Sequence, residues 1–321
     1  MSEQRKVIAV LGATGSQGGG LVQAILADPS AEFAARAVTR NAGSAKAREL
    51  AALGAEVVEA DLDDEAGLRA AFEGAHGVFV VTNFWQPRTA EQAAARTAAE
   101  MEKDQAGNAA RAARDAGVRH VVWSTLEDTR EFFGVGGERV PTLDGGTYTV
   151  PHFDAKAEAD ELFRQAGVPT TYLRTTYFYE GFLGMFAPRR DEHGRLVLAL
   201  PMAGARLSGI AVEDIGRTAL GVFRRGGDLA GRTVSIAGDH LTGAEYAEAI
   251  GAAIGEPVTY QAVPFEQMRA VSVEVANMFQ YYAENEKEFV GDRDLDAVRA
   301  LNPGLRSFAA WAEAHRDAIP H

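Results

Sequence analysis

The sequence contains no cysteine, few lysines and fewer basic than acidic side chains. The absence of cysteine excludes disulfides, thiolate catalysis, cysteine-ligated zinc and iron–sulfur clusters. Any redox function must therefore reside in a bound molecule. The 321 residues carry 32 Lys and Arg against 45 Asp and Glu, which gives a net charge of −13. This balance argues against nucleic acid as a partner, because a phosphate-binding groove needs clustered Lys and Arg.

Long apolar runs and paired histidines are also absent. No stretch approaches the roughly 18 apolar residues that a membrane span needs. The first apolar run, residues 7–11, is too short for the core of a signal peptide. We therefore predict a cytoplasmic protein with no membrane partner. The seven histidines are scattered and none pairs at i, i+4, so we expect no metal site. We also expect no flavin.

Short apolar strands alternate with amphipathic segments in the first half of the chain. This pattern predicts a parallel sheet that helices cover on both faces, an α/β fold of the doubly wound, Rossmann type. The predicted strands are residues 7–11, 35–39, 56–59, 78–82 and 121–124. The predicted helices are residues 17–27, 45–53, 65–72 and one long helix over about 89–116.

The alternation stops after residue 124. Residues 129–150 are rich in glycine and show no period, which is typical of a lid, a binding loop or a disordered insertion. We predict a dinucleotide-binding domain over residues 1–175, to which residues 206–237 return. Residues 176–205 and 238–321 are predicted to form a smaller α/β domain over its cleft, which would hold substrate or a partner.

A glycine-rich loop stands between the first predicted strand and the first predicted helix. Its residues are Gly12, Ala13, Thr14, Gly15, Ser16, Gln17 and Gly18. Glycines at this spacing let the backbone turn tightly and approach a pyrophosphate, and the helix N-terminus offers free N–H groups to that anion. The placement between strand and helix favours a dinucleotide site over a plain tight turn.

Polar residues at the ends of the next strands point to the same crevice. Arg40 ends the second strand, 22 residues after Gly18, where an acidic residue would hold the ribose of NAD. A guanidinium there suits a 2′-phosphate, so the sequence favours NADP(H) and leaves NAD(H) open. Asp61 follows the third strand as an adenine contact or a helix N-cap. Thr82, Asn83, Phe84 and Trp85 follow the fourth strand.

The residues expected to carry chemistry depart from the usual dehydrogenase pattern. Short-chain dehydrogenases place a serine at the end of the fifth strand and Tyr-x-x-x-Lys on the next helix. Here Ser124 stands at the strand end and Lys156 on the helix, but His152 replaces the tyrosine. We predict that Lys156 contacts the cofactor. His152 is either a proton donor or a residue at the helix start.

The chain resembles the NmrA-like family of atypical short-chain dehydrogenases over nearly its whole length. The strings that carry the resemblance are residues 12–18, 38–40, 61, 82–85, 123–127, 152–156, 177–180 and 276–283. The resemblance implies an NADP-binding Rossmann domain with a smaller C-terminal domain. It also implies these cofactor contacts: the 12–18 loop, Arg40, Asp61, Leu62, Thr82, Asn83, Phe84, Lys156, Thr176, Tyr177, Phe178 and Tyr179. The second basic residue expected just after Arg40 is missing from residues 41–44.

Three functions fit these residues. The first is an oxidoreductase of an aromatic or quinone-like molecule, because a planar acceptor mainly needs stacking on a nicotinamide. Its substrate pocket would use Phe84, Trp85, Tyr177, Tyr179 and Phe182. The second is a non-enzymatic redox sensor that acts through a protein partner, as the resemblance also allows. The third is an oxygenase without metal or flavin that acts on a polyphenol. The sequence leaves a homo-oligomer open.

Overall fold

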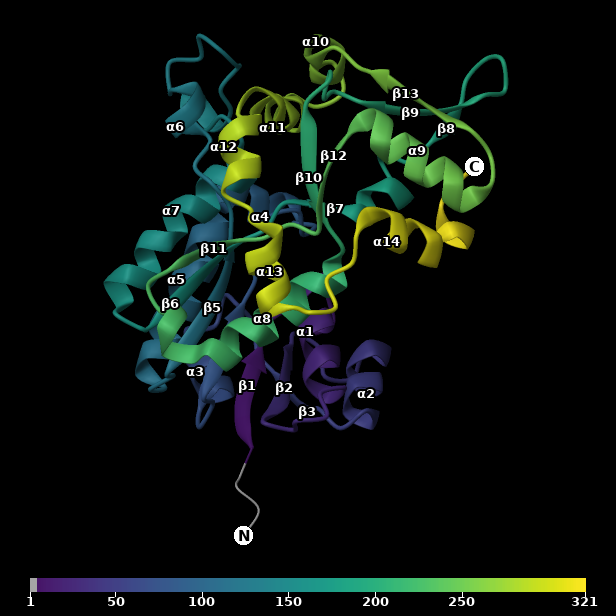
Figure 1. The fold of residues 1–321 in the computed structure, drawn as a ribbon. Coiled ribbons are helices and arrows are strands. Elements are labelled where there is room, and N and C mark those ends of the chain that lie inside the picture. The colour runs from purple at the N-terminus through teal and green to yellow at the C-terminus, as the bar shows by residue number, and fades with distance from the viewer. Residues whose placement is uncertain (1–4) are drawn as a thin grey trace. The chain divides into compact units, whose positions relative to one another are not determined.

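The computed structural model describes residues 5–321 and groups them into two compact units. Unit 1 comprises residues 5–128, His152–Arg174 and Ile215–Val234, and unit 2 comprises Thr129–Pro151, Thr175–Asp214 and Ser235–His321 (Figure 1). These units differ from the predicted domains at residues 129–151, 175, 206–214 and 235–237, which group with unit 2. None of the helices in residues 5–321 is long and apolar enough to cross a membrane.

A seven-stranded sheet forms the centre of unit 1, in the order β11-β6-β5-β4-β1-β2-β3. The strands are β1 (Lys6–Val10), β2 (Phe33–Thr39), β3 (Glu56–Glu59), β4 (Gly77–Val80), β5 (His120–Thr125), β6 (Thr170–Arg174) and β11 (Thr233–Ser235). The pairs from β3 through β6 are all parallel. The predicted doubly wound α/β class is therefore confirmed. Strand order reverses between β1 and β4, and in such sheets ligands bind beyond the carboxyl ends of the strands at this point.

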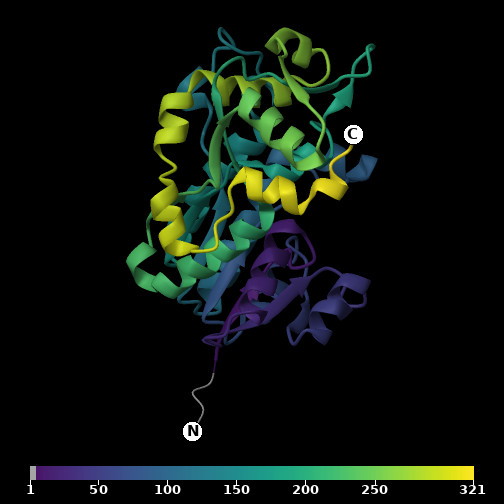
Figure 2. The ribbon, with the colours of Figure 1, turned by 45° about the vertical axis from the view of Figure 1, so that its right-hand side comes forward.

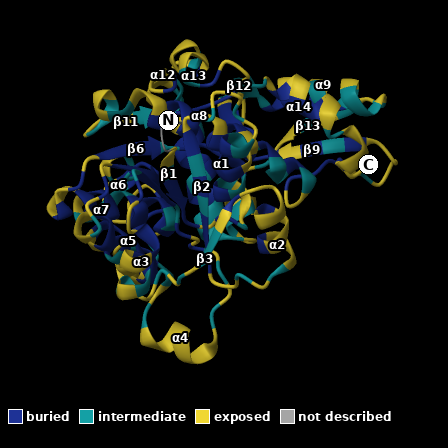
Figure 3. Ribbon diagram, turned by 90° about the horizontal axis from the view of Figure 1, so that it is seen from below, coloured by how far each residue is buried: buried dark blue, intermediate teal, exposed yellow. Residues whose placement is uncertain are grey.

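Helices cover both faces of this sheet. They are α1 (Ser16–Leu26), α2 (Ala45–Ala52), α3 (Glu65–Phe72), α5 (Ala98–Asp115), α7 (Pro151–Ala166) and α8 (Val212–Arg225). Helix α4 (Ala90–Ala95) has no buried residue and projects away from the sheet in Figure 3. In Figure 3, α3, α5 and α7 lie on one side of the strands and α1 and α8 on the other. Gly216 of α8 packs directly on α1, where an added Cβ would lie 2.3 Å from the backbone carbon of Gly20.

The single helix predicted over about 89–116 is wrong, because the structure breaks it into α4 and α5. Arg96 has extended backbone between them, with φ −157° and ψ 150°. Thr89 and Thr97 each start a helix with a capping box, in which the threonine hydroxyl and a Gln or Glu three residues later satisfy each other's backbone N–H groups. Two strong start signals eight residues apart therefore outweigh the continuous alanine pattern.

Unit 2 contains two small sheets and a set of short helices (Figure 2, with the C-terminal helices in yellow). Its strands are β7 (Tyr177–Phe178), β8 (Arg189–Arg190), β9 (Leu196–Leu200), β10 (Arg206–Ile210), β12 (Asp239–Thr242) and β13 (Val258–Ala262). Its helices are α6 (Arg130–Phe133), α9 (Gly243–Ile254), α10 (Phe265–Arg269), α11 (Val273–Glu284), α12 (Glu286–Gly291), α13 (Leu295–Leu301) and α14 (Phe308–Ala314).

The glycine-rich segment 129–150 is tied to α11 within unit 2. The Asn277 side chain donates to the carbonyl oxygens of Pro141 and Thr149, at 2.8 Å each. The Arg139 guanidinium lies 4.2 Å from the Phe132 ring centre and 2.9 Å from a carboxylate oxygen of Glu284. Because side chains from outside the segment hold its backbone, it is part of the fold of unit 2 rather than a disordered insertion.

Candidate functional site

The carboxyl ends of β1 to β4 surround a pocket of about 210 Å³ in unit 1. Its lining residues are Leu11, Gly12, Thr14, Gly15, Val38, Thr39, Arg40, Ala60, Asp61, Leu62, Val81, Asn83, Gln86 and Gln105. Seven residues predicted to contact a dinucleotide thus meet at one place, together with Gln86 and Gln105, which sequence reasoning missed. The pocket lies where the strand order reverses, as expected for a ligand site.

The glycine loop has the geometry that an anion site requires. Gly12 has a φ of +64°, in the left-handed region that favours glycine. At Gly18 an added Cβ would lie 2.5 Å from the carbonyl oxygens of both Gly12 and Leu11. Helix α1 begins at Ser16 with Gly15 as its N-cap, and glycine has no side chain with which to cap the first N–H groups. The loop therefore presents bare backbone and a helix N-terminus to the pocket.

Arg40 and Asp61 stand at the rim of this pocket. Arg40 is exposed, and its guanidinium is 3.2 Å from the side-chain oxygen of Gln86. Asp61 accepts a hydrogen bond of 2.9 Å from the backbone N–H of Asp63. The N-cap of α3 is Asp64, so the structure excludes the alternative in which Asp61 caps this helix.

Lys156 lies in a buried polar cluster with Thr82 and Glu102. Its ammonium nitrogen is 2.7 Å from the Thr82 hydroxyl oxygen and 2.5 Å from a carboxylate oxygen of Glu102. The Thr82 hydroxyl donates to that same carboxylate oxygen. Lys156 is 8% exposed and Glu102 is fully buried, and the other Glu102 oxygen has no hydrogen-bond partner in residues 5–321. The predicted cofactor lysine is thus part of a buried ion pair.

Sequence reasoning missed Glu102, although the sequence held a signal. Glu102 lies on the same face of α5 as Ala99, Ala106 and Ala109, all of them buried. A carboxylate among small residues at this helical spacing indicates a buried charge, which needs a cation beside it. The sequence does not show which residue supplies that cation.

Ser124 and His152 have different surroundings. The Ser124 hydroxyl donates to the Gln17 side-chain oxygen over 2.8 Å, which ties the end of β5 to the glycine loop. The His152 ring packs 5.2 Å from Trp85 and 5.9 Å from Phe84, measured between ring centres. Trp85 is 60% exposed, whereas Phe84 is buried. Phe84, Trp85 and His152 therefore form an aromatic group, open to solvent through Trp85, that follows directly on Thr82 and Asn83.

Asp160 lies beneath the Lys156 cluster. One of its carboxylate oxygens accepts from the Trp123 indole over 2.9 Å and from the Thr125 hydroxyl over 2.7 Å. The Trp123 ring centre is 4.8 Å from the Lys156 ammonium. Burial raises the pKa of Asp160 from 3.8 to about 6, although both hydrogen bonds favour the charged form. A buried carboxylate thus supports the indole against which Lys156 packs.

Asp160→Asn is expected to stabilise the protein at pH 8 and to have little effect at pH 4. The folded state holds the Asp160 proton up to about pH 6, whereas the unfolded chain loses it near 3.8. The free energy of unfolding therefore falls as the pH rises between these values, by up to about 3 kcal/mol. Asparagine keeps an oxygen for Trp123 and Thr125 without this cost. Urea unfolding of both proteins at pH 4 and 8 measures the difference, and an equal effect at both pH values would contradict the assignment.

The residues predicted from 176 to 182 all belong to unit 2. The Thr176 hydroxyl donates to the Ser208 carbonyl over 2.8 Å, and Phe178 pairs with Ile210 of β10. Tyr179 and Phe182 are fully buried against Phe308.

Tyr177 is also nearly buried, with its ring 5.3 Å from that of Phe182 and 5.8 Å from that of Phe279. Burial raises the pKa of Tyr177 and of Tyr179 far above the ordinary tyrosine value. These aromatic rings pack as core, so Tyr177, Tyr179 and Phe182 are not retained as substrate contacts.

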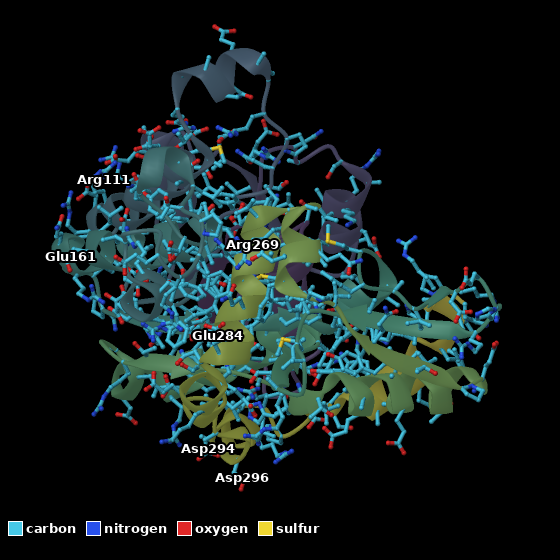
Figure 4. All side chains as sticks on the ribbon, turned by 90° about the horizontal axis from the view of Figure 1, so that it is seen from above. Arg111, Glu161, Arg269, Glu284, Asp294 and Asp296 are labelled. Atoms are coloured by element: carbon cyan, nitrogen blue, oxygen red, sulfur yellow. The ribbon has the colours of Figure 1, made fainter. Side chains whose placement is uncertain are left out.

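A larger hollow of about 740 Å³ lies on the outer side of α5 and α7. Its charged side chains pair with one another, as in the contacts Lys103–Glu158 at 2.8 Å and Arg96–Asp104 at 3.0 Å. Arg111 and Glu161, which also line it, are labelled at the edge of the molecule in Figure 4. Among residues 5–321 no group of three His, Asp or Glu side chains could hold a metal ion. The pocket at the carboxyl ends of β1 to β4, called the glycine-loop pocket below, is therefore the better candidate site.

The proteins with similar sequences include one that is named an oxidoreductase and one that is named an azoreductase. The NmrA-like family domain-containing oxidoreductase himF of Aspergillus japonicus is 35% identical over 230 residues, which cover 68% of this chain and 64% of that protein. The chain therefore spans less than two thirds of that relative's length. The NAD(P)H azoreductase of Xenophilus azovorans is 28% identical over 322 residues, which cover 98% of this chain and 99% of the azoreductase.

Two solved structures share the fold, and a family model matches almost the whole chain. NmrA, a negative transcriptional regulator in complex with NADP, has a TM-score of 0.73 at 22% identity, covering 97% of this chain and 95% of NmrA. The Citrobacter sp. triphenylmethane reductase complexed with NADP(H) has a TM-score of 0.71 at 20% identity, covering 98% of this chain and 100% of the reductase. The model of the NmrA-like family matches residues 4–311, and the chain therefore belongs to the NmrA-like family.

Proposed function

We propose that the chain is an NAD(P)H-dependent reductase of planar aromatic small molecules, such as quinones, azo compounds or triarylmethane dyes. The observation that carries the proposal is the exposed Trp85 ring, packed with Phe84 and His152 immediately after the strand end that lines the glycine-loop pocket. A solvent-open indole beside a dinucleotide pocket offers a flat acceptor a surface to stack on. The names of the azoreductase and of the triphenylmethane reductase support this substrate class.

The pocket residues fit a nicotinamide dinucleotide. The bare backbone around Gly12 and Gly18 suits the pyrophosphate, Arg40 suits the adenosine end, and Asn83 suits the part nearer Trp85. The bound dinucleotide would supply the hydride. What the protein then supplies is orientation, together with the exclusion of water around the stacked rings.

Proton supply in this proposal does not come from Lys156. Its ammonium is engaged by Glu102 and Thr82, so its role is to hold the segment that follows β4. His152 lies against the stacking surface, and its imidazole is the candidate proton donor. A quinone-like acceptor needs little acid assistance, which fits the missing tyrosine.

NADPH oxidation by the full chain tests the proposal, with a panel of a quinone, an azo dye and a triphenylmethane dye as acceptors. We expect turnover with at least one acceptor, and a KM at least tenfold higher for Trp85→Ala with kcat changed much less. Trp85→Phe is the matched control, because it keeps an aromatic surface. An oxygen electrode separates acceptor reduction from the oxygenase alternative, in which a polyphenol would consume oxygen without NADPH.

The second candidate function is a redox sensor that binds the dinucleotide without turning it over. The observation that favours it is the commitment of Lys156 to a buried ion pair, together with the absence of Tyr-x-x-x-Lys. NmrA, a solved structure with the same fold, is a negative transcriptional regulator. Tight NADPH binding with no oxidation by any acceptor in the panel would replace the reductase by this function.

Arg40→Ala is expected to weaken NADP(H) binding by about 1–3 kcal/mol and to leave NAD(H) binding nearly unchanged. The reason is that a guanidinium at the end of β2 can form charge-assisted hydrogen bonds to a 2′-phosphate, which NAD(H) lacks. Titration of both dinucleotides into wild type and variant measures the two losses. Equal losses of affinity for NADP(H) and NAD(H) would mean that Arg40 stacks on the adenine and does not bind the 2′-phosphate.

A further inference from the structure

Strand β13 of unit 2 has one open edge. It stands at the end of the strand order β13-β9-β8, so β9 pairs with one edge and no other strand of residues 5–321 pairs with the second. Just after β13, the backbone N–H of Val263 donates to the carbonyl oxygen of Leu200 in β9 over 3.0 Å. Backbone groups alternate in direction along a strand, so the N–H groups of Tyr260 and Ala262 point away from β9. This edge therefore offers backbone donors and acceptors to another strand.

The sequence of β13 does not protect this edge. Natural edge strands are protected by lysine, proline or a bulge. The five residues of β13, Val258–Ala262, include no charged residue and no proline, and they pair with β9 in unbroken register. Thr259, Gln261 and Ala262 are exposed. An exposed and uncharged edge of this kind can accept an added strand.

A groove of about 610 Å³ lies between β13 and helix α9, which run beside each other in Figure 1. One face of α9 and residues 256–260 line it. None of the described residues that line it belongs to β9, which places the groove on the open side of β13. Gly251 of α9 approaches the chain so closely that an added Cβ would lie 3.0 Å from the carbonyl oxygen of Glu256. Ala244 and Ala252 line the same wall, so side chains of an added strand that point toward α9 have room to enter the groove.

The charge of the groove favours a basic occupant. The charged residues that line it, Glu248 and Glu256, are both carboxylates. The Arg190 guanidinium already holds Glu256 through two contacts, of 2.8 Å and 2.9 Å. Glu248 is exposed and forms no ion pair within residues 5–321. A Lys or Arg side chain complements this free carboxylate, whereas a second copy of the chain would bring the same carboxylates and a net charge of −13 to the interface.

We infer that the groove between α9 and the open edge of β13 binds an extended basic peptide of a partner protein. The peptide adds a strand to β13 and places a Lys or Arg side chain on Glu248. Backbone hydrogen bonds to β13 supply affinity, and the groove supplies specificity for alternate side chains. This surface goes beyond the proposed function, because no described residue lines both the groove and the glycine-loop pocket.

The probe is the fluorescently labelled peptide acetyl-TVTKTVT-amide, titrated with the full chain and followed by anisotropy. In an extended strand its lysine and both valines project from the same face. We expect saturable binding, and about fivefold weaker binding when glutamate replaces the lysine of the peptide. Two further peptides carry methyl groups on alternate backbone nitrogens. One of them should lose about tenfold or more in affinity and the other about twofold at most, because only one set of N–H groups faces β13.

Two variants of the chain locate the binding site. Glu248→Gln should weaken binding of the lysine peptide about three- to fivefold and reduce its advantage over the glutamate peptide. Asp296→Asn is the matched control, because it removes a carboxylate from an exposed position on α13, labelled in Figure 4, and should change the Kd by less than about twofold. Ala262→Pro removes one outward N–H, which an edge strand tolerates, and should weaken binding by about fivefold without lowering the melting temperature.

Four outcomes would overturn the inference. They are the absence of saturable binding up to about 1 mM chain, equal affinity for the lysine and glutamate peptides, equal affinity for the two methylated peptides, and a dimer in analytical ultracentrifugation that Ala262→Pro dissociates. The last outcome would assign the open edge to a second copy of the chain. All of these measurements are made without NADPH or an acceptor, so their failure leaves the proposed function standing.

Discussion

Lys156→Met is expected to lower the free energy of unfolding by about 3–5 kcal/mol, because it leaves the Glu102 carboxylate buried without a cation. Methionine has nearly the length of lysine, so the loss does not come from an empty cavity. Within the described part of the chain, one Glu102 oxygen already lacks a hydrogen-bond partner, and the other would keep only the Thr82 hydroxyl. Urea denaturation at neutral pH, followed by circular dichroism, measures the loss.

A double-mutant cycle separates this electrostatic cost from packing. Glu102→Gln in the Lys156→Met background removes the uncompensated charge, and we expect it to recover more than half of the lost stability. Lys103→Ala is the control, since Lys103 is the next residue on α5 and its ion pair with Glu158 is about one third exposed. It should cost no more than about 1 kcal/mol. A Lys156→Met loss as small as that of the control would contradict the buried-pair account.

This ion pair marks where prediction from the sequence stops. The place of Lys156 follows from local patterns, a strand predicted to end at Ser124 and a helical pattern after residue 150. Its partner does not, because Glu102 is 54 residues earlier on a different helix. Only the packing of α5 beside α7 brings the two charges together. A helical or strand repeat relates residues a few positions apart, so it cannot predict a contact between two helices that are far apart in the sequence.

The two units differ in how far local sequence determines them. In unit 1, β1, β2, β4 and β5 are short runs made mostly of apolar residues, with helical periods between them, so the parallel sheet could be predicted. In unit 2, strands such as β7 and β8 have two residues each, too few to show alternation. Tyr179 and Phe182 illustrate the consequence for the site. The sequence pattern of an aromatic residue is the same in a core and in a ligand pocket. Only the contacts of Tyr179 and Phe182 with Phe308 show that these two rings belong to the core.

Gly18→Ala is expected to abolish most dinucleotide binding, with a rise in the Kd of NADPH of at least thirtyfold, and to cost about 1–3 kcal/mol of stability. The added Cβ would lie 2.5 Å from two backbone carbonyl oxygens, those of Leu11 and Gly12. Neither oxygen can move aside as a side chain does, because both belong to the turn that joins β1 to α1. The turn must open, and the geometry that suits a pyrophosphate is lost with it.

Gly19→Ala is the internal control for this prediction. It adds the same methyl group one residue later in α1, where the nearest carbonyl oxygen, that of Ala13, is 3.2 Å away. That contact is tight, but alanine gains about 1 kcal/mol over glycine in a helix, so the net change in stability should be small. Titration with NADPH and urea unfolding of both variants measure the two effects together. Similar Kd values for the two variants would mean that the close approach at Gly18 does not shape the ligand site, and that the loop binds its anion through the helix N-terminus alone.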